Sequence, residues 1–248
     1  MVDGADVSGW SDVASGWAEL WGSFAAPAQE ELIAHCGIGP GTRVLDVGCG
    51  SGEFLARLSE VGAEPTGAEP APAMVAAASV HAPVVEADAE DLPFDESRFD
   101  VVTAVNALQF ADDTTTALRE FSRVLVPGGR IGIANWAEAA RNDIDVIEGA
   151  VALALDEEQA PDGPLRPAGG IESAMADAGL EVVSAGIVAV PWRAADDVTL
   201  VRGILLGEDA ATMAELHDVI VTAAAPFRGA DGAYVLRNAF RWAVAIAR

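Results

Sequence analysis

The chain has 248 residues, of which 51% are hydrophobic and 21% are charged, so it can bury a sizeable core. Its 14 basic residues are all arginine and stand against 39 acidic residues, which gives a net charge of −25 at pH 7. An acidic surface repels a polyanion, and no basic stripe interrupts it. This charge balance excludes nucleic acid as the expected substrate.

Cysteine content and the N-terminal sequence bear on the cellular compartment. Cys36 and Cys49 lack the spacing of a zinc site and are too few for a disulfide framework. The first ten residues are acidic where a signal peptide is basic, and no apolar run approaches the roughly 18 residues that a membrane span needs. We therefore expect a cytoplasmic protein without membrane contact, as a monomer or homodimer.

The first part of the chain predicts two helices followed by alternating strands and helices. Tryptophans at helical spacing indicate the first helix, and residues 28–36 indicate the second. Apolar runs that alternate with helices indicate a parallel sheet covered on both faces. The expected strands are 42–48, 64–70, 82–88, 99–107 and 130–136, and the expected helices between them are 53–60, 71–79 and 114–125.

After Trp136 the pattern loosens. It predicts helices over 144–155 and 171–180 and strands over 181–190 and 234–247. Residues 192–232 separate the last two strands, predict two helices, and are too many for a plain connection. We interpret this insertion as a helical lid over the substrate side, with a packing or dimerisation role as the alternative.

The fold class predicted is therefore α/β: a doubly wound, mostly parallel, seven-stranded sheet with N-terminal helices and a helical insertion before the last strand. We expect one domain over 1–248, with an N-terminal helical cap at 1–39, a cofactor-binding core at 40–136 and the lid at 192–232.

A glycine-rich turn, VLDVGCGSG at 44–52, places Gly48, Gly50 and Gly52 between a strand and a helix. Glycine lets the chain turn sharply and approach a ligand closely, and the N–H groups at the helix start point toward that ligand. The dinucleotide fingerprint needs a further glycine where this chain has Glu53, whose charge disfavours a pyrophosphate. A nicotinamide or flavin dinucleotide is therefore the weaker alternative.

The same turn resembles the first motif of the class I S-adenosylmethionine-dependent methyltransferases, and the resemblance covers about residues 40–136. It implies a Rossmann-like methyltransferase fold, with S-adenosylmethionine as cofactor and S-adenosylhomocysteine as product. It also implies that Asp46 and the backbone of the glycine turn hold the methionine part of the cofactor. Trp17 is expected to form an aromatic wall beside that part, although a tryptophan at helical spacing is also typical of core.

The resemblance extends to three later strand ends. Glu69 matches the acid that accepts hydrogen bonds from both ribose hydroxyls. Asp88 matches the acid that faces the adenine amino group, and Asn106 lies in the segment beneath the sulfonium centre. The implied cofactor-binding residues are Trp17, Asp46, Gly48, Cys49, Gly50, Glu69, Pro70, Asp88, Ala89, Asn106 and Ala107.

The acceptor is expected to be a small molecule with an O, N or C nucleophile, as in biosynthetic enzymes of secondary metabolism. The fourth strand does not end in the N/D-P-P-Y sequence of amino-methylating nucleic-acid enzymes, and the double glutamate of protein arginine methyltransferases is absent. Asp112 and Asp113 could bind magnesium, but ADDTTT is more typical of a helix start with N-cap acids. We therefore predict no metal.

Two residues are candidates for catalysis. His217, in the insertion, is the candidate general base, with an ordinary surface histidine as the alternative. Gln109 is the candidate for positioning the cofactor or substrate. The alternative function is a protein that binds S-adenosylmethionine without methyl transfer, as a cyclase or a regulatory partner.

Overall fold

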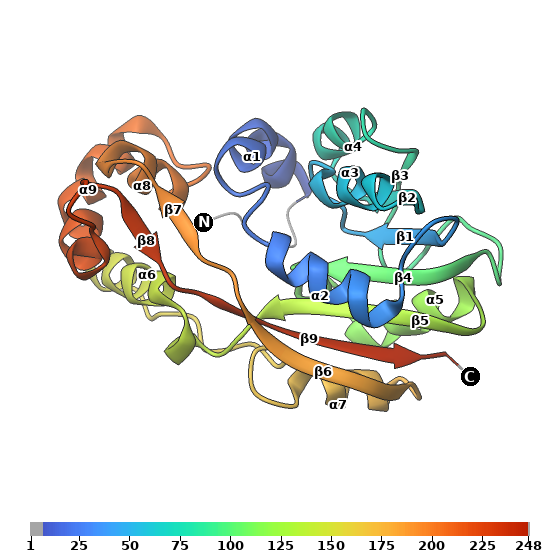
Figure 1. Ribbon diagram of the computed structural model, residues 1–248. Coiled ribbons are helices and arrows are strands. Elements are labelled where there is room, and N and C mark those ends of the chain that lie inside the picture. The colour runs from blue at the N-terminus through green and yellow to red at the C-terminus, as the bar shows by residue number, and fades with distance from the viewer. Residues whose placement is uncertain (1–6, 248) are drawn as a thin grey trace.

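The computed structural model describes residues 7–247; the first six residues of the predicted N-terminal cap and residue 248 lie outside the described residues. Seven strands form the main sheet: β1 (Arg43–Val47), β2 (Glu64–Glu69), β3 (Val84–Glu86), β4 (Phe99–Val105), β5 (Leu125–Trp136), β6 (Glu181–Ala189) and β9 (Ala239–Ile246). Their order is β3-β2-β1-β4-β5-β9-β6 (Figure 1). The first five strands of that order pair in parallel, and β9 is antiparallel to both its neighbours. The predicted seven-stranded, mostly parallel sheet is confirmed.

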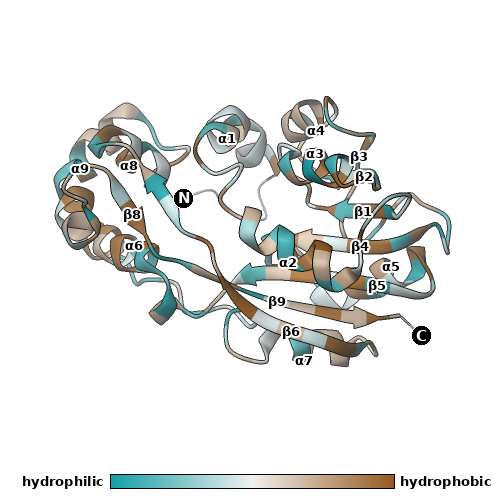
Figure 2. Ribbon diagram, viewed as in Figure 1, coloured by the Kyte–Doolittle hydropathy of each residue, from teal (hydrophilic) through white to brown (hydrophobic). Residues whose placement is uncertain are grey.

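Helices cover both faces of this sheet. They are α1 (Val7–Leu20), α2 (Ala26–Cys36), α3 (Glu53–Glu60), α4 (Pro72–Ala78), α5 (Thr114–Val124), α6 (Asp143–Ala154), α7 (Gly170–Asp177), α8 (Asp197–Ile204) and α9 (Ala210–Ala224), with short 3₁₀ turns η1 (Leu108–Phe110), η2 (Ala139–Arg141) and η3 (Ala225–Phe227). One core lies under α2 and α3, and a second lies under α5 and α7 on the opposite face (Figure 1). Ile131 and Ile133 of β5 are fully buried, as expected of a strand covered on both faces, and Figure 2 shows brown segments on this strand. Among residues 7–247, no helix combines the length and the apolar character that crossing a membrane requires.

The sequence of α5 shows why these helices form where they do. Leu118, Phe121 and Val124 recur at helical spacing and are fully buried against the sheet. Asp113 caps the helix, because its side chain accepts hydrogen bonds from the N–H groups of Thr115 and Thr116. This cap confirms that Asp113 belongs to a helix start.

The prediction of one closing strand over 234–247 is wrong. The chain forms β8 (Tyr234–Leu236), which pairs with β7 (Trp192–Ala194) in a separate two-stranded ribbon, and then β9. Asn238 sits between the two strands, and its buried side chain accepts a 3.2 Å hydrogen bond from the N–H of Ile144. A polar side chain anchored to α6 at this point lets the backbone change partners from one sheet to the other.

The insertion over 192–232 is not wholly helical, because it begins with β7 and then forms α8 and α9. It packs on the end of α1: the rings of Trp21 and Trp192 stack at 4.5 Å between centroids. The Trp21 indole donates a hydrogen bond to the carbonyl of Gly203, and the Trp192 indole donates one to that of Leu20. Its role as a lid stays a prediction.

Candidate functional site

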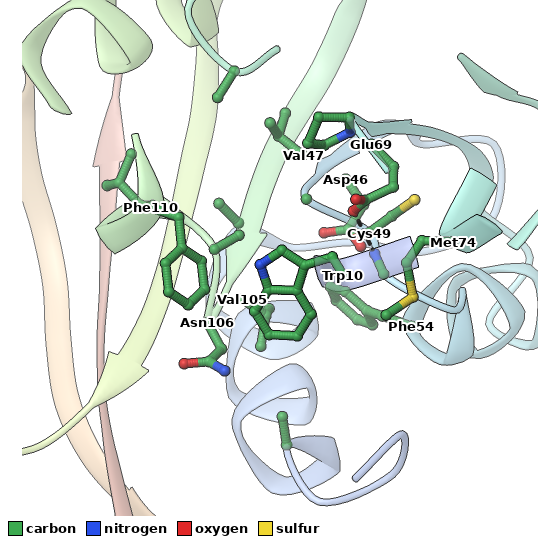
Figure 3. Close-up of a pocket in the computed structure, with 18 of the residues that line it drawn as sticks. Trp10, Asp46, Val47, Cys49, Phe54, Glu69, Met74, Val105, Asn106 and Phe110 are labelled. Carbon is green, nitrogen blue, oxygen red and sulfur yellow. Dashed lines mark hydrogen bonds between the residues drawn. The ribbon is translucent and has the colours of Figure 1, made fainter. Parts of the chain in front are cut away.

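A cavity of about 290 Å³ opens at the carboxyl ends of β1, β2, β3 and β4 and is closed by α1 and the start of α2. The strand order reverses between β1 and β4, and ligands of open α/β sheets bind at such a point. The structure brings all eleven predicted cofactor residues to this cavity: Trp17, Asp46, Gly48, Cys49, Gly50, Glu69, Pro70, Asp88, Ala89, Asn106 and Ala107. Figure 3 labels four of them, Asp46, Cys49, Glu69 and Asn106.

The glycine turn requires glycine at two positions, both for its backbone conformation and for the close packing of neighbouring atoms against it. Gly48 has a φ of 67°, and a Cβ atom added to it would overlap the Cβ of Ala107. Gly52 has a φ of 94°, and its Cβ would lie 2.7 Å from the Cα of Ala78. At Gly50, by contrast, an added Cβ would meet Trp17 Nε1 at an ordinary contact distance of 3.8 Å, which leaves the backbone there accessible to a ligand.

Glu69 lies at the end of β2 and is 6% exposed. One carboxylate oxygen accepts a 3.0 Å hydrogen bond from the N–H of Gly50, and the other accepts a 3.1 Å bond from the N–H of Ala71. Burial raises the pKa of this carboxyl, and the two N–H groups oppose the increase. Each oxygen has a second lone pair, so this fixed carboxylate can still accept two hydrogen bonds from a ligand.

Asp46, at the end of β1, is buried, and this burial affects the pH at which its carboxyl ionises. Burial raises its pKa from 3.8 to about 7, a 2.7 Å hydrogen bond from the Thr103 hydroxyl opposes the shift, and the charge of Glu69 adds to it. Thr103 is fully buried on β4, directly beside Asp46 in the parallel register. The sequence analysis missed Thr103, although the alignment of neighbouring strand ends could have identified it.

Two further polar residues at the cavity were missed. Gln29 is 7% exposed and lines the cavity, and its side-chain amide has no hydrogen-bond partner among residues 7–247. It shares the inward face of α2 with Leu32 and Cys36, so helical periodicity could have identified it. Glu53 also lines the cavity, and a Cβ added to Gly22 would overlap its carboxylate. Gln29 and Glu53 therefore supply amide and carboxylate groups to a ligand.

Aromatic rings close the mouth of the cavity. Trp10 contacts Trp17 edge-on at 5.3 Å and Phe110 at 5.6 Å between ring centroids. Figure 3 shows the Trp10 ring between Phe110 and Met74, in front of the carboxylates. Trp17 also contacts Phe24 at 6.1 Å. The tryptophans of α1 are thus both packed against one another and part of the cavity wall.

The structure does not bring the two catalytic candidates into the cavity lining. His217 lies on α9 with 42% of its side chain exposed, and its Nδ1 is 2.9 Å from the carboxylate of Asp218. This position gives no support to a general-base role. Gln109 does not line the cavity but donates hydrogen bonds to Asn106, which does. Within the described range 7–247, no three His, Cys, Asp or Glu side chains are grouped so that they could hold a metal ion.

Comparison with known proteins finds similarity to methyltransferases over part of the chain. Residues 45–133 match the model of a methyltransferase domain. The chain is 37% identical to the ubiquinone/menaquinone biosynthesis C-methyltransferase of Idiomarina loihiensis over 114 residues, which cover 41% of this chain and 45% of that protein. It is 34% identical to the 27-O-demethylrifamycin SV methyltransferase of Amycolatopsis mediterranei over 141 residues, which cover 48% of this chain and 52% of that protein. Residues 45–133 are therefore similar to a methyltransferase domain, which agrees with the resemblance to the class I S-adenosylmethionine-dependent methyltransferases.

A solved structure agrees with this methyltransferase fold. The YcgJ protein of Bacillus subtilis superposes with a TM-score of 0.60 at 18% identity, over 89% of this chain and 98% of that one. The chain spans about half the length of the curated relatives it matches.

The residues of the cavity fit the cofactor of this methyltransferase family. Glu69 offers two acceptors suited to a pair of ribose hydroxyls, and the open side of Gly50 allows a close approach of the ligand to the backbone. Gln29 provides unpaired amide groups for the amino-acid end of the cofactor. Aromatic faces and carboxylates also suit a cationic sulfonium.

Proposed function

We propose that this methyltransferase transfers a methyl group from S-adenosylmethionine to an O, N or C atom of a small-molecule acceptor, in biosynthesis of the secondary-metabolite type. The observation that carries the proposal is Glu69, a buried carboxylate fixed by two backbone N–H groups beside the glycine turn. The names of the two curated relatives support it, because both are methyltransferases and one is named for ubiquinone/menaquinone biosynthesis.

The protein's contribution to the reaction is mainly alignment. S-adenosylmethionine, when bound, supplies an activated methyl group and its own leaving group. The glycine turn and Glu69 hold the ligand against the strand ends, while Trp10, Trp17 and Phe110 exclude water from the cavity. Orientation in a dry site can contribute roughly 7–11 kcal/mol to a displacement of this kind.

The charges at the cavity favour a small acceptor that is not an anion. Every charged side chain that lines it among the described residues is acidic: Asp46, Glu53, Glu69, Asp88 and Asp112. With the net charge of −25, this lining opposes binding of nucleic acid. We further propose a cytoplasmic protein, as a monomer or homodimer, with no membrane partner.

Calorimetry with S-adenosylmethionine and S-adenosylhomocysteine tests the cofactor. The wild type is expected to bind both, and Glu69→Gln is expected to bind about 10- to 100-fold more weakly, because hydrogen bonds to a charged group contribute about 1.5–3 kcal/mol. Glu86→Gln is the matched control, since Glu86 is the exposed register partner of Glu69 on β3. Absence of binding at high micromolar concentration contradicts the proposal.

Turnover is tested separately, by measuring S-adenosylhomocysteine formation with a panel of small hydroxyl, amine and carbon-acid acceptors. Product with at least one acceptor supports methyl transfer. Cofactor binding without product from the whole panel refutes it and favours a protein that binds the cofactor without methyl transfer.

A further inference from the structure

Asn106 has an unusual backbone conformation at the edge of the cavity. It follows β4 directly, has a φ of 54°, and lines the cavity, where Figure 3 shows its amide side chain. Its own N–H donates a 2.8 Å hydrogen bond to the carbonyl of Ala134 on β5. Asparagine tolerates left-handed backbone better than most residues, so the sequence permits this turn of the chain.

Gln109 fixes the orientation of that amide. Its Nε2 donates a 3.0 Å hydrogen bond to the backbone carbonyl of Asn106 and a 2.9 Å bond to Asn106 Oδ1. Because a backbone carbonyl can only accept, the Gln109 group that faces Asn106 must be the NH₂ group. Because NH₂ can only donate, the Asn106 atom that meets it must be the oxygen.

Gln109 keeps this orientation although it leaves one of its own side-chain atoms without a hydrogen-bond partner. Gln109 Oε1 is buried and has no hydrogen-bond partner in the described part of the chain. A buried acceptor without a partner is unfavourable. Gln109 nevertheless keeps its NH₂ group toward Asn106, because the backbone carbonyl of Asn106 can only accept, and this carbonyl therefore fixes the orientation of the Gln109 amide. Since Oδ1 of Asn106 is engaged by Gln109, the group that Asn106 offers a ligand is Nδ2, a hydrogen-bond donor.

We propose that Gln109 is a positioning residue that presents Asn106 Nδ2 to the acceptor, and that the acceptor is a hydroxyl compound. A hydroxyl oxygen has two lone pairs, so one can accept the N–H bond while the other attacks the methyl carbon. A neutral amine has one lone pair, which the attack uses. Its N–H groups would then face Asn106 Nδ2, which is also a donor. The inference rests on the proposed methyl transfer and names its substrate class.

The transfer balances without a further reagent. The acceptor oxygen forms the new bond to the methyl carbon, the sulfur keeps the electron pair of the bond that breaks, and the hydroxyl proton passes to bulk solvent as the product leaves the cavity. Asn106 Nδ2 stabilises the oxygen as it loses that proton, because an N–H donor binds an oxyanion more strongly than a neutral oxygen.

The test uses two matched pairs of probes: 2-naphthol with 2-naphthylamine, and benzyl alcohol with benzylamine. Binding of each is measured calorimetrically to the full chain, alone and saturated with S-adenosylhomocysteine. The wild type is expected to prefer the hydroxyl member by about tenfold, as one hydrogen bond near 1.4 kcal/mol would give. Asn106→Asp, which replaces the donor by an acceptor, and Gln109→Met, which releases the clamp from outside the cavity lining, are both expected to lose that preference.

Gln159→Met is the matched control, because Gln159 also donates its amide to a backbone carbonyl, that of Asp145, but lies outside the cavity lining. It is expected to keep the hydroxyl preference. Equal or tighter binding of the amines, an unchanged preference in Asn106→Asp, no binding of either hydroxyl probe, or a product methylated on nitrogen or carbon overturns the inference. Lack of turnover despite a hydroxyl preference that depends on Asn106 contradicts the proposed function alone.

Discussion

Replacing Thr103 by valine removes the one hydroxyl that donates to the buried carboxylate of Asp46, at 2.7 Å. The folded-state pKa of Asp46 is raised to about 7, so its proton stabilises the folded protein fully below the unfolded pKa near 4. That stabilisation is lost as the pH rises through 7, because the carboxylate must then ionise in a dry site. Above pH 7 the Thr103 hydroxyl donates its hydrogen bond to the charged carboxylate of Asp46, whereas below pH 7 it donates to a neutral carboxylic acid.

The expected loss of unfolding free energy in Thr103→Val is therefore about 1 kcal/mol at pH 5 and about 2–3 kcal/mol at pH 8.5, since hydrogen bonds to charged groups contribute about twice as much as neutral ones. Urea denaturation at the two pH values measures both numbers. Thr66→Val on β2 is the control, because Thr66 lies on the other strand beside β1, opposite Leu45. Equal losses at the two pH values would refute the reasoning that Asp46 titrates near neutrality.

Three further predictions concern the cavity and its surroundings. Gly48→Ala is expected to cost about 1–3 kcal/mol of unfolding free energy, because its positive φ and the overlap with Ala107 both oppose a Cβ; a loss below about 0.5 kcal/mol in denaturation contradicts this. Gln29→Leu is expected to weaken cofactor binding by about 3- to 10-fold in calorimetry without loss of stability, and unchanged affinity contradicts a ligand-facing amide. His217→Ala is expected to keep turnover within about twofold, whereas a drop near tenfold in kcat, or about 1.4 kcal/mol, would restore the general-base role.

The parallel part of the sheet could be predicted from sequence because each strand there is a continuous apolar run with a turn after it. The cofactor candidates could be predicted for a related reason: they follow strand ends, which parallel topology brings to one edge. Asp46, Glu69, Asp88 and Asn106 come from four separate segments and line a single cavity. The resemblance to the family's motifs named these residues, and the parallel topology explains why they meet.

Local pattern was insufficient where a tertiary contact decides the structure. Residues 234–247 are mostly apolar, and the division into β8 and β9 falls at Asn238, which is anchored to α6. His217 was proposed from its chemistry, but its distance from the cavity depends on how α9 packs. Thr103 and Gln29 carry common side chains, and burial beside a partner or a cavity gives them their importance.

The position of β9 in the sheet has a consequence for folding during synthesis. Strands β1 to β5 can pair with one another as they emerge from the ribosome, whereas in the main sheet β6 pairs only with β9. While α8 and α9 are being made, the nascent chain therefore carries an open edge on β5 and an unpaired β6, the kind of surface that recruits other strands. The sheet is completed only when residues 239–246 insert between β5 and β6, both of which are synthesised earlier.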